Sequence, residues 1–406
     1  MKKIAVITMG VKLEGEKGYT RFRYLCEFLS RAGYQVDLIT TTFQHWEKEQ
    51  RDLKKIRKDT YLFGLKFIYE PGYRKNIDVR RIRSHKIAAK NLTTLLQKEG
   101  NYDLIYCEIP PNDVALAAAN YAVEKGIPFV ADVNDLWPEA MKMVVDIPLV
   151  SSALFYPLQR DAEKVYSLVS GVVGTSDEYR DYPFRNQDRQ VPKVTVYVGN
   201  EIDAFDKGAL AYAPLIPKSE GEFWVSYAGT IGTSYDIRTM VLVGEELANR
   251  GLSHIKIKIM GGGPTKDELE QLSRDRQIYN VEFLGYVPYE KMAAYLTKSD
   301  VLVNSFVKKA PQSIVTKIGD YLAAGQAMIN TCMSPEFRKK VEMDGFGVNI
   351  LPEDVGILAD AIEELYDHPD QKEEMGRRAR RIAEEQFDRP KAYRKIETLI
   401  RELTEG

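Results

Sequence analysis

Four glycine-containing segments in the third quarter of the sequence have the residue types that bind phosphate. They cover residues 227–232, 260–264, 283–288 and 316–325. Each lies near the junction of an apolar run, typical of a buried strand, and a helical pattern. Glycine lets the backbone approach a phosphate, and the first turn of a helix has unpaired N–H groups. Because all four fall within about a hundred residues, they predict one nucleotide-diphosphate site, for which one segment alone would be weak evidence.

The first two segments supply backbone contacts. The amides of Gly229, Thr230 and Gly232 could approach a β-phosphate, and Gly261 and Gly263 would let a nucleoside lie against bare backbone. A Gly-x-x-Gly sequence is at least as often a plain tight turn. The interpretation therefore depends on the four segments acting together.

Hydroxyl and ammonium groups lie beside the last segment. Ser313 and Thr316 could donate hydrogen bonds to phosphate oxygens. Lys317 could add a compensating positive charge beside a bound phosphate. Lys308 and Lys309 are alternative sources of that charge.

The elements that must position these residues alternate along the whole chain. Apolar runs alternate with longer helical patterns, which indicates parallel sheets covered by helices on both faces. Predicted strands cover residues 4–8, 36–40, 66–69, 104–106, 129–131, 172–174 and 194–197 in the first half, and 223–228, 255–260, 281–284, 301–304, 327–330 and 348–351 in the second. The chain is predicted to be α/β, with two doubly wound, Rossmann-like parallel-sheet domains.

The length of 406 residues also favours two domains. The alternation of apolar runs and helical patterns stops near residues 203–222, where prolines, glycines and mixed charge suggest a linker. We therefore predict an N-terminal domain over residues 1–205 and a C-terminal, donor-binding domain over residues 206–388.

Composition excludes several classes of site. The three cysteines are odd in number and widely spaced, and the four histidines are scattered, so neither a disulfide framework nor a metal site is indicated. We expect no metal and no cofactor. No apolar stretch approaches the roughly 20 residues that span a bilayer, and the apolar run after Met1 is better interpreted as a first strand than as a signal peptide. A cytoplasmic protein is expected.

The net charge of −2 is unevenly distributed. Residues 48–90 hold fourteen Lys or Arg and five Asp or Glu, with aromatic residues between them. Anionic lipid attracts such a surface by about 1 kcal/mol per cation, so a peripheral position at the inner face of the cell membrane is one interpretation. An ordinary solvated face is the other. Nucleic-acid binding is not expected, because no nucleic-acid motif accompanies the charge.

The ordered motifs resemble a known family. Tyr-Ala-Gly, Gly-x-Gly-Pro, Phe-Leu-Gly-x-Val-Pro and Thr-Lys-Ile-x-Asp-Tyr-Leu-Ala-Ala-Gly are similar to those of the family-four retaining glycosyltransferases of GT-B fold, above all those that build bacterial surface polysaccharides. Residues 21–23 and 132–138 extend the resemblance to nearly the whole chain. It implies that the two domains face each other across a cleft. It also implies that the last helix, within residues 389–406, packs back on the first domain.

The resemblance assigns further donor contacts. It places Asp320 at the acid that binds the ribose hydroxyls, and the main chain at Tyr286 and Val287 against the nucleobase. Eight positions before Asp320, the usual sugar-contacting acid is replaced by Gln312, whose amide could still bind a sugar hydroxyl. The Arg and Lys that often follow the first glycine turn are also missing.

The resemblance assigns acceptor-side residues in the first half. Gly18 and Arg21 match a loop that faces the donor phosphates or the acceptor, and Asn134 and Asp135 lie where relatives hold a residue near the reacting centre. Asp135 could bind an acceptor hydroxyl or cap the next helix. Glu108, at the end of another predicted strand, could contact acceptor, although a capping or turn role is the simpler interpretation. The same holds for Asn200, in a segment that resembles the family's Asn-Gly-Val-Asp.

These features predict a retaining, metal-independent hexosyltransferase. It would move a sugar from a nucleotide-diphosphate sugar, most simply a UDP-sugar, to a saccharide or polyprenyl-diphosphate-linked acceptor. In the resembled family the departing phosphate is thought to accept the acceptor's proton, so no dedicated base is needed. The departures at Gln312 and at the missing Arg/Lys pair keep two alternatives open: a non-catalytic nucleotide-binding partner subunit, or a nucleotide-sugar epimerase of the same fold.

Overall fold

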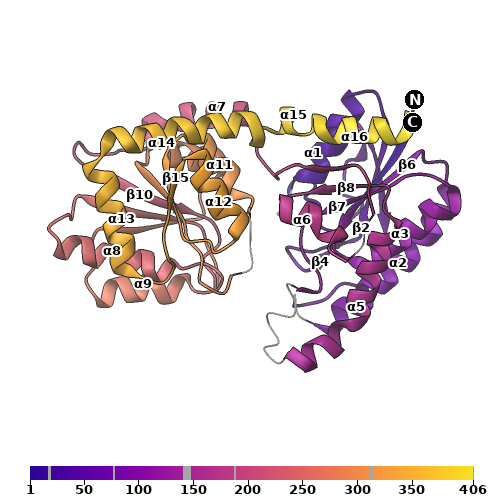
Figure 1. Ribbon diagram of the computed structural model, residues 1–406, viewed down its shortest axis with the longest axis horizontal. Helices are drawn as coiled ribbons and strands as arrows, with labels where there is room; N and C mark the ends of the chain where they lie inside the picture. The colour runs from indigo at the N-terminus through magenta and orange to yellow at the C-terminus, as the bar shows by residue number, and fades with distance from the viewer. Residues whose placement is uncertain (17–19, 76–77, 140–147, 187–188, 311–313, 406) are drawn as a thin grey trace. The chain divides into compact units, whose positions relative to one another are not determined.

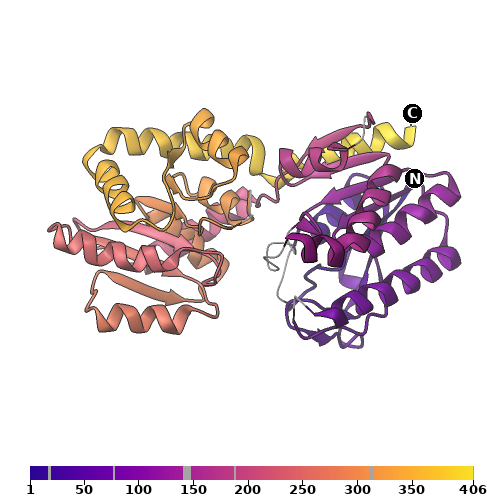
Figure 2. The same cartoon turned by 60° about the horizontal axis from the view of Figure 1, so that its bottom comes forward.

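The computed structural model describes residues 1–16, 20–75, 78–139, 148–186, 189–310 and 314–405. Contacts divide the chain into a first unit, Met1–Val196 with Tyr393–Gly406, and a second unit, Tyr197–Ala392. The helix predicted to pack back, α16 (Arg394–Glu405), belongs to the first unit, in which both chain ends lie (Figures 1 and 2).

Parallel strands form the sheet of the first unit, in the order β5-β2-β1-β6-β7-β8-β9. The apolar runs form these strands because both faces of the sheet are covered and each strand must be apolar on both sides. Their bounds are β1 Lys3–Ile7, β2 Gln35–Thr41, β5 Gly64–Ile68, β6 Leu104–Ile109, β7 Phe129–Val133, β8 Gly171–Gly174 and β9 Lys193–Thr195; a small hairpin adds β3 Phe43–Gln44 and β4 Glu49–Gln50.

Helices cover both faces of this sheet. One core joins it to α2 (Val79–Glu99), α3 (Asn112–Lys125) and α5 (Pro148–Leu168). On the opposite face lie α1 (Arg21–Arg31) and α16, where Tyr24 of α1 packs edge-on against Tyr393. The shorter elements are α6 Asp177–Asp181, η1 Lys58–Thr60 and η2 Tyr182–Phe184.

The second unit repeats the architecture with the strand order β12-β11-β10-β13-β14-β15. Its strands are β10 Phe223–Ala228, β11 Ile255–Met260, β12 Val281–Gly285, β13 Val301–Asn304, β14 Ala327–Asn330 and β15 Gly347–Asn349. Its helices are α7 Ile202–Tyr212, α8 Ile237–Asn249, α9 Lys266–Asp275, α10 Tyr289–Lys298, α11 Lys317–Ala323, α12 Pro335–Asp344, α13 Val355–Asp367, α14 Pro369–Ile382 and α15 Arg389–Ala392, with short helical turns η3 Ala213–Leu215 and η4 Ala383–Phe387. The predicted α/β class and each predicted strand are confirmed.

The linker predicted near residues 203–222 is wrong over its first half. That segment contains α7, whose Ile202, Phe205 and Ala209 enter the core beside α10. These three residues recur at helical spacing, so they form an apolar stripe. The glycine and prolines around them obscured the stripe in the sequence.

In both units the strand order reverses beside the first strand, between β1 and β6 and between β10 and β13. The chain leaves the first strand in one direction and later returns on its other side. Open α/β sheets bind ligands beyond the carboxyl ends of the strands at such a reversal. The carboxyl ends of β10 and β13, and those of β1 and β6, are therefore the places to look for sites.

Candidate functional site

Three of the predicted glycine turns lie together at the carboxyl edge of the second sheet. The amide of Gly229 donates to the carbonyl of Met260 at 3.0 Å, that of Ile231 to Gly262 at 2.9 Å and that of Gly261 to Gly285 at 2.7 Å. The turns after β10, β11 and β12 therefore form one hydrogen-bonded layer beside the strand reversal, as the sequence predicted.

Alternate amides of the first turn remain available in this layer. Gly229 and Ile231 point their N–H groups at the neighbouring strand end, whereas those of Thr230 and Gly232 make no hydrogen bond to any described residue. The N–H of Ile231 lies between these two free groups and is already bonded, so Thr230 and Gly232 offer two separate donors, each of which could bond an anion. This is the contact that the sequence predicted for a phosphate.

The glycines of this layer have two different causes. A Cβ at Gly261 would lie 1.8 Å from the carbonyl oxygen of Gly229, and one at Gly263 would lie 2.2 Å from that of Ile231. Those glycines are needed for the turns to pack on one another. At Gly262, which the sequence prediction did not include, a Cβ would meet no atom within 4 Å. The fold does not require glycine there, so Gly262 leaves open space over the turn.

Helix α11 is tied to the same edge by Tyr321. Its hydroxyl accepts from the amide of Ala228 at 2.7 Å and donates to the carbonyl of Ala228 at 3.2 Å. Thr316 immediately precedes α11 and makes no side-chain cap. Gln312 and Ser313, both predicted site residues, lie outside the described residues.

Lys317 begins α11 and sends its ammonium group into an aromatic cage. Its Nζ lies 4.3 Å from the ring centre of Tyr227, 4.7 Å from that of Tyr235 and 5.0 Å from that of Phe306. This Nζ is buried and has no hydrogen-bond partner among the described residues. Burial lowers the pKa of Lys317 to about 7, and the Cys332 thiol opposes the shift slightly.

Asp320, the predicted ribose ligand, is held by two donors. Its Oδ1 accepts from Nδ2 of Asn200 at 2.9 Å and from the hydroxyl of Tyr289 at 2.8 Å. Burial raises the pKa of Asp320, whereas these two hydrogen bonds and the charge of Arg389 lower it. Among the described residues no donor is bonded to Oδ2.

Tyr286 and Val287 follow β12 directly. The Tyr286 side chain is 86% exposed, and Val287 packs against the core that includes α11. Gly285 before them has a φ of +66°, which glycine adopts without strain. The chain thus turns sharply beside the layer of glycine turns and leaves Tyr286 accessible.

Glu108 lies at the strand reversal of the first unit. Its Oε2 accepts from Oγ1 of Thr8 at 2.6 Å and from the amide of Met9 at 3.2 Å, so it joins the ends of β6 and β1. Burial raises its pKa to about 7, against the effect of those hydrogen bonds. Glu108 therefore has the turn role that the sequence suggested. A carboxyl group at this position could also form a hydrogen bond with a ligand hydroxyl.

Arg21 has partners other than the predicted anion. It is 2% exposed, and its Nε and Nη2 donate to the two carboxylate oxygens of Asp132 at 3.1 and 3.0 Å, while Nη1 donates to the carbonyl of Val196. Burial opposes the charge, but Asp132 raises the pKa of Arg21 above its usual value. The side chain is thus neither solvated nor directed at a ligand: it is part of a buried ion pair. Gly18, predicted beside it, lies outside the described residues.

Asn134 and Asp135 brace their own loop. Nδ2 of Asn134 donates to the carbonyl oxygen and to Oδ1 of Asp132, both at 3.0 Å. Asp135 accepts from the amide of Leu136 at 2.9 Å and from Nε1 of Trp137 at 3.2 Å. Burial raises the pKa of Asp135, and the charge of Arg81 lowers it. The structure thus gives both predicted residues local partners.

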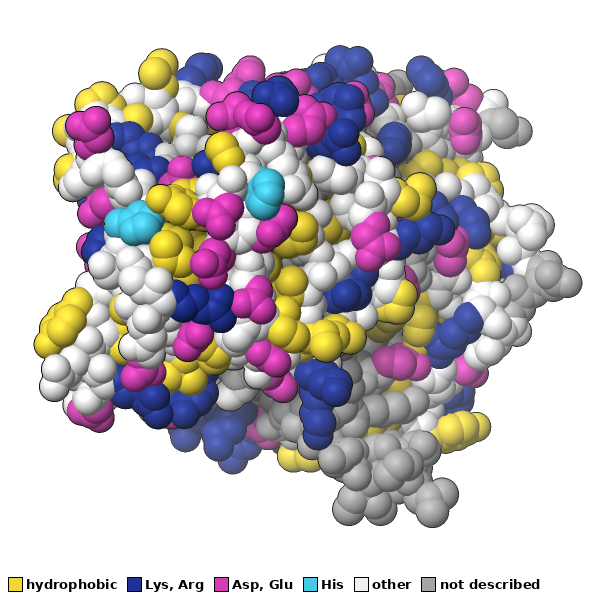
Figure 3. All heavy atoms as spheres, turned by 60° about the vertical axis from the view of Figure 1, so that its left-hand side comes forward, with side chains coloured by type: hydrophobic (Ala, Val, Ile, Leu, Met, Phe, Trp, Pro, Cys, Tyr) yellow, Lys and Arg dark blue, Asp and Glu magenta, His cyan; other side chains and the backbone are white. Residues whose placement is uncertain are grey.

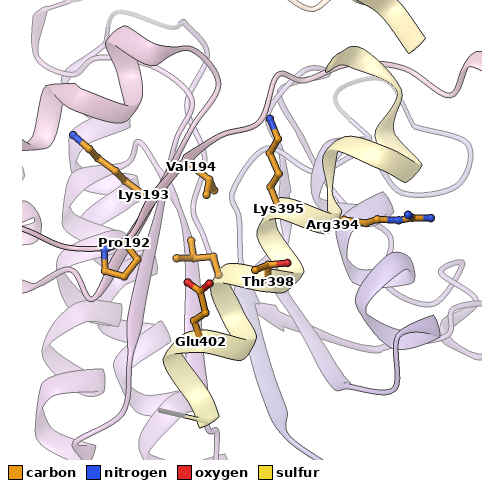
Figure 4. A pocket seen from close by; sticks show the side chains of 8 residues that line it. Pro192, Lys193, Val194, Arg394, Lys395, Thr398 and Glu402 are labelled. Atoms are coloured by element: carbon orange, nitrogen blue, oxygen red, sulfur yellow. The ribbon is translucent and has the colours of Figure 1, made fainter. Parts of the chain in front are cut away.

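A cavity of about 430 Å³ lies elsewhere in the first unit, between β9 and α16 (Figure 4). None of the predicted site residues lines it. The charged ends of Lys193 and Arg394 point away from each other, and Lys193 is paired with Asp181 at 2.6 Å. Because these charges do not converge, the cavity does not have the character of a nucleotide site.

Two further searches concern the described residues alone. They contain no group of three or more His, Cys, Asp or Glu placed to hold a metal ion. None of their helices is long and apolar enough to cross a membrane.

Comparisons with known proteins address the fold. A search of curated proteins finds no match. Solved structures similar over 99% of this chain include Anabaena HepE in complex with UDP, with 13% identity, 100% coverage of that chain and a TM-score of 0.71. Sucrose-phosphate synthase from Thermosynechococcus elongatus has 17% identity, 99% coverage of that chain and a TM-score of 0.71. WaaG, a glycosyltransferase involved in lipopolysaccharide biosynthesis, has 12% identity, full coverage of that chain and a TM-score of 0.67.

A family model matches the part of the chain that carries the glycine turns. Residues 225–368 match the model described as glycosyl transferases group 1. This interval runs from β10 to the end of α13 and so contains the hydrogen-bonded layer, Lys317 and Asp320. The chain therefore has the GT-B fold of glycosyltransferases, and its second unit carries the sequence pattern of glycosyl transferases group 1.

Proposed function

We propose that the protein is a retaining glycosyltransferase that transfers a sugar from a UDP-sugar to a saccharide or polyprenyl-diphosphate-linked acceptor. The observation that carries the proposal is the layer of glycine turns at the strand reversal, with the free amides of Thr230 and Gly232 at the same sheet edge to which Tyr321 ties α11, the helix that carries Lys317 and Asp320. Structural neighbours in complex with UDP and with UDP-glucose support the choice of nucleotide.

Each group has a task in such a transfer. The amides of Thr230 and Gly232 would bind the β-phosphate, whose charge grows as the sugar leaves. Lys317 would take up a proton when the anion binds and would then add a positive charge. Asp320 would accept hydrogen bonds from the ribose. In the proposed reaction the departing phosphate would itself accept the acceptor's proton, as the resemblance implies, so no dedicated base would be needed.

The donor proposal is tested by ligand-induced stabilisation. UDP-, GDP- and dTDP-sugars would be compared by thermal shift, because a ligand that binds only the folded state raises its melting temperature. The largest shift is expected with a UDP-sugar. Anomeric configuration of the product, read by NMR, then tests retention. Donor binding without transfer to any polyprenyl-linked sugar would favour the non-catalytic partner subunit instead.

A membrane-surface acceptor would explain the basic segment over residues 48–90. Lys54, Lys55, Arg57 and Lys58 are exposed, and exposed apolar side chains, among them Leu62 at 61%, lie in the same segment. Two of the interleaved aromatic residues, Phe63 and Tyr73, are buried instead. On the face shown in Figure 3, Lys and Arg are interspersed with Asp and Glu over most of the described residues.

Replacing those four cations together with glutamine should reduce sedimentation with anionic vesicles. Each cation near an anionic surface contributes about 1 kcal/mol, so the loss should be large at low salt and small on neutral vesicles. Unchanged sedimentation with vesicles containing phosphatidylserine would discard the membrane surface and leave the solvated-face interpretation.

A further inference from the structure

The carboxylate of Asp320 is oriented by side chains from two other elements. Asn200 lies on the segment between β9 and α7, and Tyr289 is the first residue of α10. Both donate to Oδ1, at 2.9 and 2.8 Å. Since two fixed donors on one oxygen define the rotation of a carboxylate, Oδ2 is left as the acceptor for a further donor.

Asn200 is itself rigidly placed. Its amide donates to the carbonyl of Phe387 at 3.0 Å, and its carbonyl accepts from the amide of Arg389 at 2.9 Å. Gly199 before it has a φ of +58°, and a Cβ there would lie 2.2 Å from the carbonyl oxygen of Phe387. The backbone is thus pinned on both sides, and the side chain, in a residue that is 5% exposed, has little freedom.

The arrangement is not one that stability alone would select. Oδ1 of Asn200 is buried and has no hydrogen-bond partner among the described residues. A buried unsatisfied polar atom costs about 1–3 kcal/mol. Burial of Asp320 without a cationic partner in hydrogen-bond contact adds to that cost. Groups kept in place at a cost to stability are expected at functional sites.

We propose that Asn200 and Tyr289 are positioning residues for the nucleotide's ribose: they turn Asp320 so that Oδ2 accepts hydrogen bonds from the vicinal hydroxyls. This rests on the proposed nucleotide site and adds two residues that act through Asp320. Ribose hydroxyls are donors and a carboxylate is an acceptor only, so the pairing is chemically matched.

The test compares two ligands on two variants. Tyr289→Phe removes one hydroxyl and Asn200→Ser shortens the other donor. Affinities for UDP and for 2′,3′-dideoxy-UDP are measured by isothermal titration calorimetry, with Tyr279→Phe, a site 87% exposed, as the matched control. Each variant should weaken the affinity for UDP about 3- to 10-fold, the effect of one ordinary hydrogen bond, and should change the affinity for dideoxy-UDP less than about 2-fold.

The dideoxy ligand separates orientation from folding. A variant that merely disturbs the structure weakens both ligands alike, and that outcome overturns the proposal. So does an unchanged ratio of the two affinities in both variants when the wild-type protein binds UDP tightly; the proposed function would then stand without it. Failure of the wild-type protein to bind UDP overturns the proposed function and this inference together.

Discussion

Replacing Lys317 with methionine should stabilise the second unit at neutral pH, and the gain should shrink as the pH rises. Methionine keeps the length of the side chain and fits an aromatic cage. It removes an ammonium group whose Nζ is buried without a hydrogen-bond partner among the described residues. Most core substitutions destabilise a protein, so the sign of this one is diagnostic.

The magnitude follows from the lowered pKa of Lys317. In the folded protein the pKa is about 7, against 10.5 for the exposed group. Below pH 7 both states carry the proton, and the cost of burying the charge is fully present. Between pH 7 and 10.5 the folded state has released a proton that the unfolded state still holds, so stability rises with pH. Integrating that difference from pH 7 to 9 gives about 2 kcal/mol.

The wild-type protein should therefore gain up to about 2 kcal/mol relative to Lys317→Met over this interval. Other titrating groups are common to both proteins and cancel. Urea unfolding can be followed by fluorescence of Trp224, which is buried in the second unit, after Trp46 and Trp137 are replaced by phenylalanine. Lys309→Met, an exposed site near the same edge, is the control and should show no pH-dependent difference.

An equal difference between variant and wild type at pH 7 and pH 9 would refute the argument, because it would mean that Lys317 keeps its proton in the folded state. A second measurement examines the same proton. At pH 8 Lys317 is neutral in most of the folded protein. If the bound anion restores its positive charge, Lys317 should take up nearly one proton for each UDP that binds. Calorimetry in buffers of different ionisation enthalpy measures that uptake, and Lys317→Met should abolish it.

The two kinds of glycine should respond differently to replacement by alanine. Gly261→Ala should lower the free energy of unfolding by more than about 2 kcal/mol, because its Cβ would overlap a carbonyl oxygen. Gly262→Ala should leave the urea midpoint unchanged and weaken the affinity for UDP. Arg21→Met should cost about 3–5 kcal/mol, since it leaves a buried carboxylate unpaired; Arg31→Met, 66% exposed, should cost less than about 0.5 kcal/mol by the same denaturation assay. Asp320→Ala should weaken UDP by about 1–3 kcal/mol in calorimetry, and unchanged affinity would remove Asp320 from the site.

Much of the fold could be predicted because buried parallel strands are nearly continuous apolar runs, such as residues 4–7 and 301–303. Because β10, β11 and β12 are neighbours in the second sheet, the glycine turns that follow them meet at one edge of that sheet. The role of Arg21 could not be predicted, since its partner Asp132 is 111 residues away. Each of the two residues, taken alone, is of a type that usually lies at the surface. The role of Tyr289 could not be predicted either, since its partner Asp320 is 31 residues away, although Tyr289 directly follows the predicted nucleobase segment.

The glycines themselves carried less information in the sequence than their number suggested. Gly261 and Gly263 are glycine because a neighbouring carbonyl occupies the space of their side chains, and this would hold in a protein that binds nothing. Gly262 has room for a side chain, and the amides of Thr230 and Gly232 have no partner among the described residues. A bound ligand would therefore explain Gly262 and the two free amides, whereas Gly261 and Gly263 are explained by packing. The free amides, the open glycine and the ammonium group of Lys317, which has aromatic neighbours but no hydrogen-bond partner among the described residues, are the features that the fold alone leaves unexplained, and an anion bound at this edge would account for all three.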